Sequence, residues 1–182
     1  MRSYRTLALT IVICLTSMGV GEVRTGLDNV ASHSSLFASK RIGIIANHTS
    51  HDRQGRFIVD VLKDVDDARV VALFSPEHGL YGVEEAGETI GDRRDPKYGL
   101  PVHSLYGETR KPTPEMLEGI DVLVYDIQDV GVRFYTYIST MSLAMEAAGE
   151  CGKRFVVLDR PNPIGGVEVE GPILEPAQTS FV

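Results

Sequence analysis

The chain has 182 residues and a formal net charge of −7, with 43% hydrophobic and 24% charged residues. This length is enough for one sizeable hydrophobic core, and the composition is that of a globular protein rather than a disordered one. Affinity for nucleic acid comes mainly from clustered Lys and Arg, and the sequence has no such cluster, which argues against a nucleic-acid partner.

The first 21 residues have the layout of a secretory signal peptide. Arg2 and Arg5 precede an apolar run over residues 7–20, and small residues at Gly19 and Gly21 suit a signal peptidase. The run is short for a membrane span, which needs about 20 apolar residues. We therefore expect a secreted or periplasmic protein with no stable membrane insertion after cleavage, and an uncleaved N-terminal anchor is the alternative. Only Cys151 would remain after cleavage, so no intramolecular disulfide is expected.

Apolar runs and helical spacings alternate along the rest of the chain. A short helix is expected over residues 27–37, with Asp28 as its N-cap, and further helices over 57–63, from Thr113 and over 135–151, the last ended by Gly149 or Gly152. Residues 84–100, rich in Gly and charge, are expected to form a long loop. The predicted strands are residues 41–46, 69–74, 101–106, 122–125 and 155–158.

This alternation predicts an α/β fold, with a mainly parallel, Rossmann-like sheet covered by helices on both faces. Four of the predicted strands end in a polar cluster, and parallel strands place their carboxyl ends on one edge of the sheet, where open α/β sheets bind their ligands. The clusters are Asn47 and His48; Glu77 and His78; Asp126, Gln128 and Asp129; Asp159, Arg160 and Asn162. Such a set fits a sugar or another small polar ligand.

Carboxylates dominate the convergent set. Paired carboxylates in a cleft can have their pKa values pushed apart, and glycoside hydrolysis is the commonest use of such a pair. The alternative for Asp126 and for Asp159 is the capping of a following turn or helix, whereas Glu is a poor capping residue and Pro76 fixes the backbone before Glu77.

An arginine and two tyrosines follow the third cluster. Arg133 suits a ligand carboxylate, and the rings of Tyr135 and Tyr137 suit sugar faces. In the alternative reading, Arg133 pairs with Asp126 or Asp129 and the tyrosines lie in the core.

Other site classes lack their sequence patterns. The spacings of the histidines match no zinc pattern, so no metal is expected. The turn after the first strand lacks the glycines of a dinucleotide fingerprint, and neither a phosphate loop nor a Gly-x-Ser-x-Gly elbow occurs, so no cofactor is expected.

Four ordered motifs closely resemble those of the DUF1343 family, the bacterial exo-β-N-acetylmuramidases of glycoside hydrolase family 171. They are Pro76-Glu77-His78-Gly79, Leu100-Pro101-Val102-His103-Ser104-Leu105-Tyr106-Gly107, the run from Asp126-Ile127-Gln128-Asp129 to Tyr137, and Leu158-Asp159-Arg160-Pro161-Asn162-Pro163. The resemblance covers residues 26–182 and implies a Rossmann-like N-terminal catalytic domain followed by a smaller C-terminal domain. Family members continue for roughly another domain, so we expect this chain to be truncated at its C-terminal end.

The resemblance also implies an activity and its residues. Glu77 corresponds to the catalytic glutamate of the family, with Asp126, Asp129 or Asp159 as partner, and the expected activity is release of N-acetylmuramic acid from the non-reducing end of peptidoglycan fragments. A non-catalytic module for cell-wall sugars, or an inactive fragment, is the alternative. The residues expected to bind the substrate are Asn47, His78, Gln128, Asp129, Arg133, Tyr135, Tyr137, Arg160 and Asn162.

Overall fold

One six-stranded sheet forms the centre of the molecule. The structure, a computed structural model, describes residues 23–85 and 93–181. The strands are β1 (Arg41–Ala46), β2 (Arg69–Ser75), β3 (Arg93–Arg94), β4 (Pro101–Ser104), β5 (Val122–Asp126) and β6 (Arg154–Val157). Their order is β3-β4-β2-β1-β5-β6, and every neighbouring pair is parallel except β3 with β4. The α/β, mainly parallel fold predicted from the sequence is confirmed.

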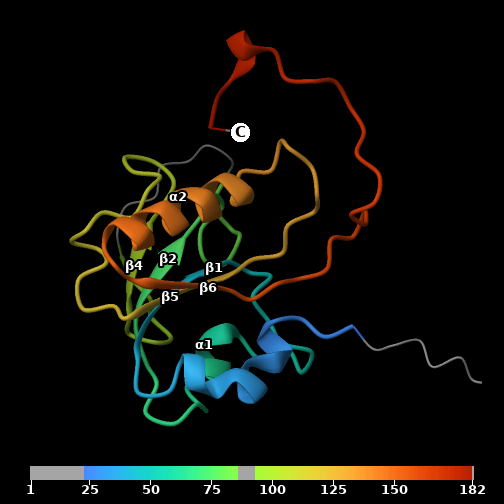
Figure 1. The fold of residues 1–182 in the computed structure, drawn as a ribbon. Coiled ribbons are helices and arrows are strands. Elements are labelled where there is room, and N and C mark those ends of the chain that lie inside the picture. The colour runs from blue at the N-terminus through green and yellow to red at the C-terminus, as the bar shows by residue number, and fades with distance from the viewer. Residues whose placement is uncertain (1–22, 86–92, 182) are drawn as a thin grey trace, which may run out of the picture.

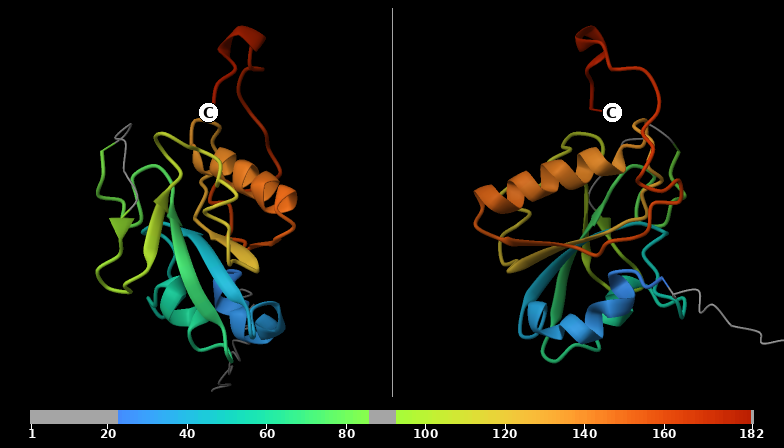
Figure 2. Two further views of the ribbon diagram at one scale, coloured as in Figure 1. Left: turned by 90° about the vertical axis from the view of Figure 1, so that its left-hand side faces the viewer. Right: turned by 45° about the vertical axis from the view of Figure 1, so that its right-hand side comes forward.

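Helices cover both faces of the sheet (Figures 1 and 2). The helical elements are η1 (Leu27–Leu36), α1 (Ile58–Leu62), α2 (Tyr137–Glu150) and a short turn of helix, η2 (Pro176–Gln178). The central strand β1 serves both layers, because Ile42 and Ile44 join the core beneath η1 and α1, while Ile45 joins the core beneath α2. A central parallel strand is buried on both faces, which explains its continuous apolar sequence.

Helix α2 confirms the longest predicted helix. Gly152, at φ +63°, ends it with a left-handed turn, and the N–H of Lys153 donates to the carbonyl of Ala148 over 2.8 Å.

Two local predictions are wrong. No helix starts at Thr113: residues 114–119 form only turns, because Gly119 adopts a left-handed φ of +74° three residues before β5 begins. Asp28 is not an N-cap either. It lies inside η1, where its Oδ2 accepts from the N–H of Thr25 over 2.9 Å, and its own N–H donates to the hydroxyl of Thr25.

The segment after β6 leaves the body of the molecule and forms an exposed arch (Figures 1 and 2). Residues 161–180 are all exposed, and Val167 and Val169 are each 96% exposed.

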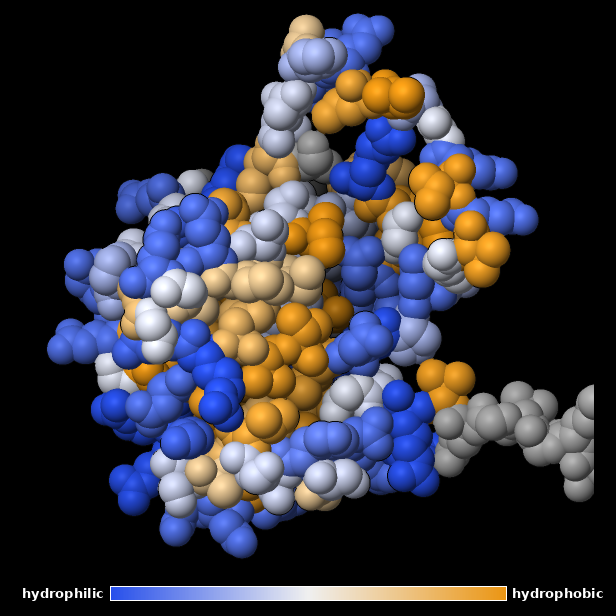
Figure 3. Space-filling view, in the orientation of Figure 1, coloured by the Kyte–Doolittle hydropathy of each residue, from blue (hydrophilic) through white to orange (hydrophobic). Residues whose placement is uncertain are grey.

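Hydrophobic side chains gather on the face of the molecule between α2 and the two helices η1 and α1, over β6, as Figure 3 shows. Within residues 23–85 and 93–181, no helix is long and apolar enough to cross a membrane, and the predicted signal peptide lies outside these residues.

Candidate active site

The polar loops predicted to converge do meet at the carboxyl edge of the sheet. The loop after β1 is tied to the loop after β5 by hydroxyl groups: the Thr49 hydroxyl accepts from the N–H of Gln128 over 3.0 Å, and the Ser50 hydroxyl donates to the carbonyl of Asp126. Buried Asn47 closes the same turn, with its Oδ1 accepting from the N–H and hydroxyl of Thr49 over 2.9 and 2.6 Å. Asn47, which was expected to bind substrate, thus stabilises the loop after β1 at the carboxyl edge of the sheet.

Glu77 follows β2 and is held by a hydroxyl group from another element. Its Oε2 accepts from the hydroxyl of Thr136, at the start of α2, over 2.9 Å. The Tyr106 hydroxyl, after β4, also interacts with Glu77, and this interaction raises the pKa of Tyr106 above its usual range. Glu77 is half-buried, and its carboxylate is oriented rather than free to rotate.

The loop that follows Glu77 folds back on itself. His78 adopts a left-handed φ of +67°, and its Nδ1 lies 3.1 Å from the carbonyl of Glu84. The Glu84 carboxylate packs against Gly79, where an added Cβ would lie 2.0 Å from Oε2, and it accepts from Arg93 on β3 over 2.6 Å. The short strand β3, inside the predicted loop 84–100, thus anchors the loop that carries Glu77.

A cavity of about 470 Å³ opens beside Glu77. It is lined by His48, Glu77, His78, Gly82, Phe134, Tyr135, Thr136 and Tyr137. His48 lies against the backbone at Gly82, where an added Cβ would approach its Nδ1 to 2.3 Å. Phe134, Tyr135 and Tyr137 form an aromatic wall on one side of this cavity. The centroid of the Tyr135 ring lies 5.9 Å from that of Phe134 and 5.7 Å from that of Tyr137, and both pairs meet edge to face.

Tyr137 marks the buried end of this aromatic wall. Burial raises the pKa of its hydroxyl. Four residues from the sequence-based site, Glu77, His78, Tyr135 and Tyr137, therefore share one cavity.

Asp126 and Arg160 form a buried ion pair beneath the edge. Arg160 donates to both carboxylate oxygens of Asp126, from Nε over 2.6 Å and from Nη2 over 3.0 Å, and Nη2 also donates to the carbonyl of His51 over 3.1 Å. The side chains are 0% and 8% exposed. Burial raises the pKa of Asp126, and the charge and hydrogen bonds of Arg160 oppose that rise. Neither residue lines the cavity beside Glu77.

The remaining acidic and amide candidates support the loops. The Gln128 amide donates to the carbonyls of Asp129 and Pro161 over 2.6 and 2.9 Å. Asp129 accepts from the N–H of Gly131 over 2.7 Å, while its buried Oδ2 finds no hydrogen-bond partner among the described residues. Asp159 is exposed, and its carbonyl accepts from the N–H of Gly26 over 2.7 Å.

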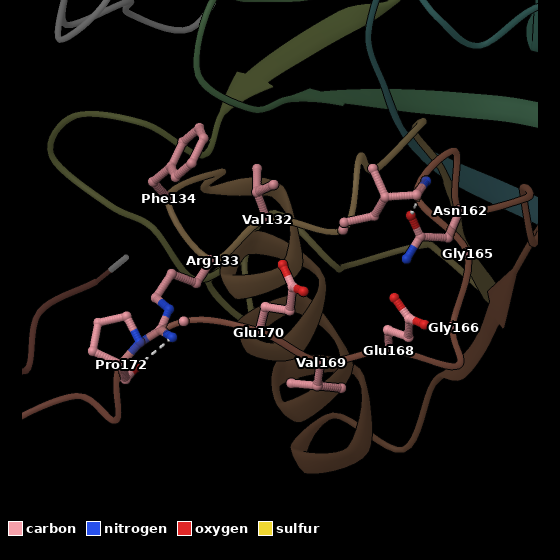
Figure 4. A pocket seen from close by; sticks show the side chains of 13 residues that line it. Val132, Arg133, Phe134, Asn162, Gly165, Gly166, Glu168, Val169, Glu170 and Pro172 are labelled. Atoms are coloured by element: carbon pink, nitrogen blue, oxygen red, sulfur yellow. Dashed lines mark hydrogen bonds between the residues drawn. The ribbon is translucent and has the colours of Figure 1, made fainter.

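Arg133 and Asn162 belong to a second cavity, of about 680 Å³, between the loop after β5 and the exposed arch (Figure 4). Arg133 donates to the carbonyl of Pro172 over 2.6 Å, and the Asn162 side chain lies against Gly131 and accepts from the N–H of Ile164 over 3.1 Å. Phe134, 70% exposed, lines both cavities.

Sequence reasoning missed three residues that the structure adds to the site: Tyr106, Phe134 and Thr136. Each lies inside a motif already singled out, yet none belongs to a residue type that signals catalysis. Only the packing of β4 and α2 against the loop after β2 brings them to Glu77 and its cavity. No group of three or more His, Cys, Asp or Glu residues suited to hold a metal ion occurs within the described part of the chain.

Comparison with known proteins identifies the family. Residues 42–182 match the family model described as exo-beta-N-acetylmuramidase NamZ, N-terminal. The chain is 52% identical, over 162 residues, to a Bacillus subtilis protein named peptidoglycan beta-N-acetylmuramidase NamZ, covering 88% of this chain and 39% of that protein.

Two crystal structures of DUF1343 family proteins from Bacteroides fragilis share the fold. One has a TM-score of 0.77 at 50% identity, covering 87% of this chain and 40% of its own, and the other has a TM-score of 0.73 at 36% identity, covering 89% and 41%. The chain therefore spans about two-fifths of the length of these relatives. It belongs to the NamZ family of exo-β-N-acetylmuramidases, and residues 42–182 match the N-terminal part of that family.

Proposed function

We propose that the protein is a glycoside hydrolase that releases N-acetylmuramic acid from the non-reducing end of peptidoglycan fragments. The observation that carries this proposal is Glu77, a carboxylate oriented by the hydroxyl of Thr136 on the wall of a cavity with an aromatic side. A carboxyl group in this position can give a proton to the glycosidic oxygen or take one from an attacking water. Membership of the muramidase family supports the same substrate class.

The partner of Glu77 is proposed to be Asp129 or Asp159 rather than Asp126. Asp126 has both carboxylate oxygens bound by Arg160 and is fully buried, so its role in this proposal is to hold the edge of the sheet together. An acid that must give or take a proton at the substrate needs to reach the substrate, directly or through one water.

Arg133 is the better candidate for recognition of the lactyl carboxylate that distinguishes muramic acid from glucosamine. Arg133 is exposed, and among the described residues its guanidinium donates only from Nη2, to the carbonyl of Pro172. An Arg fork matches a carboxylate in geometry and charge. Arg160, in contrast, uses Nε and Nη2 for Asp126 and the carbonyl of His51. The rings of Phe134 and Tyr135 would then pack against the sugar.

The site of action is proposed to lie outside the cytoplasm, in the periplasm or the medium. The support is the predicted signal peptide over residues 1–21, together with a substrate class that belongs to the cell wall. Mass determination of the protein exported by its host would test the proposal, and an intact N-terminus on cytoplasmic protein would contradict it.

Replacement of Glu77 by Gln tests the function. We expect release of N-acetylmuramic acid from a chromogenic glycoside to fall by about 10² to 10⁴-fold, as is typical for loss of a general acid or base. The matched control is Glu85→Gln, which makes the same change at an exposed residue of the same loop. Circular dichroism of both variants checks the fold, and an unchanged rate for Glu77→Gln would remove Glu77 from the mechanism.

A binding module for cell-wall sugars is the second candidate, because the exposed rings of Phe134 and Tyr135 beside the cavity suit the face of a sugar whether or not it is cleaved. Calorimetry with muropeptides separates the two functions. Binding without any turnover by the wild-type chain would favour the module, and turnover would favour the enzyme.

A further inference from the structure

The start of helix α2 departs from ordinary capping. Thr136 occupies the N-cap position of this 14-residue helix, and Thr is favoured there because its side-chain oxygen can accept from an N–H of the first turn. No such side-chain bond forms here. The hydroxyl of Thr136 instead donates to Oε2 of Glu77, which lies 59 residues away in the sequence, over 2.9 Å.

This hydroxyl is fixed by its surroundings. Thr136 is only 8% exposed, and its carbonyl accepts from the backbone N–H of Thr140 over 3.0 Å. The backbone that carries the hydroxyl is thus part of the helix, and its side chain points away from the helix axis to the cavity wall. A rigid helix is a better support for a site than a loop, and Glu77 itself lies on a loop.

We propose that Thr136 is a positioning residue for Glu77, holding the carboxylate in the orientation that proton transfer at the glycosidic bond requires. The proposal rests on the proposed function of Glu77. It goes further by assigning to the start of α2 a part in positioning the Glu77 carboxylate.

The experiment compares Thr136→Val, Thr136→Ser and Thr140→Val. Valine keeps the shape of threonine without the hydroxyl, and serine restores the hydroxyl. Thr140 is the matched control, because it is a fully buried threonine one turn further along α2 whose hydroxyl bonds the backbone at Thr136 and not Glu77. Each variant is assayed on the chromogenic glycoside for kcat and KM separately.

We expect Thr136→Val to lower kcat by about 10- to 100-fold, as for loss of a hydrogen bond to a charged group, with KM within about threefold of wild type. Thr136→Ser should recover most of kcat, and Thr140→Val should keep it. Equal kcat for Thr136→Val and Thr140→Val, or failure of Thr136→Ser to recover kcat, would overturn the proposal. Full activity of Thr136→Val beside an inactive Glu77→Gln would refute the positioning role while the proposed function stands.

A second readout does not depend on turnover. In chains labelled with ¹³C at glutamate side chains, Thr136→Val should move the Glu77 carboxyl resonance, assigned by its loss in Glu77→Gln, and Thr140→Val should leave it in place. A Glu77 resonance unchanged by Thr136→Val would refute the hydrogen bond and the proposal with it.

Discussion

Removal of Arg160 tests whether the carboxyl edge of the sheet depends on a buried ion pair. In Arg160→Ala, the Asp126 carboxylate loses hydrogen bonds of 2.6 and 3.0 Å. The Asp126 side chain, which is 0% exposed in the structure, is left without its partner charge. The carbonyl of His51 loses a third bond, of 3.1 Å. Breaking a buried pair by deleting one partner costs about 3–5 kcal/mol, because the other charge is left uncompensated.

The chain offers a matched control in Arg41→Ala. Arg41 also makes two side-chain hydrogen bonds to one carboxylate, that of Asp121, over 3.1 and 2.9 Å, but the two side chains are 53% and 36% exposed. Exposed pairs contribute about 0–1 kcal/mol. The free energy of unfolding, from urea titrations followed by circular dichroism, should therefore fall several-fold more for Arg160→Ala than for Arg41→Ala.

The loss should also depend on pH. Burial already raises the pKa of Asp126, and removing the Arg160 charge raises it further above the value in the unfolded chain. A carboxyl group whose folded pKa lies above its unfolded pKa costs stability as pH rises between the two values. The penalty in Arg160→Ala should thus be smallest near pH 4 and grow toward pH 8. Losses equal to those of Arg41→Ala, or independent of pH, would refute the buried pair and return Asp126 to the candidates for catalysis.

Two further substitutions test the walls of the cavities. Arg133→Gln should reduce cleavage of muramic glycosides at least about tenfold more than cleavage of the matching glucosamine glycosides, as for loss of a charge-assisted pair, and equal losses on both would remove the carboxylate recognition. Gly82→Ala should destabilise the protein by about 1 kcal/mol or more beyond Gly99→Ala in urea unfolding, since both glycines have a left-handed φ, of +68° and +67°, but only Gly82 faces a ring, that of His48. Equal losses at the two glycines would show that His48 does not pack there.

Local patterns were enough to predict the sheet. Apolar runs such as residues 41–46 identify strands buried on both faces, and the alternation with helices fixes a parallel sheet, so the convergence of Glu77 with the other strand ends follows from topology alone. The same local logic failed at Thr113, where a favourable helix start is cancelled by the left-handed Gly119 and the nearby start of β5.

The sequence by itself thus determined which residues reach the edge of the sheet, because strand direction and side-chain type are local properties. Only the tertiary structure decided what each of them does there. Asp126 and Arg160, 34 residues apart, are drawn into a buried pair because β5 and β6 are neighbours. The hydroxyl of Thr136 donates to Glu77 because the loop after β2 brings the carboxylate within 2.9 Å of the start of α2. Such contacts depend on register and packing between distant segments, which no local pattern contains.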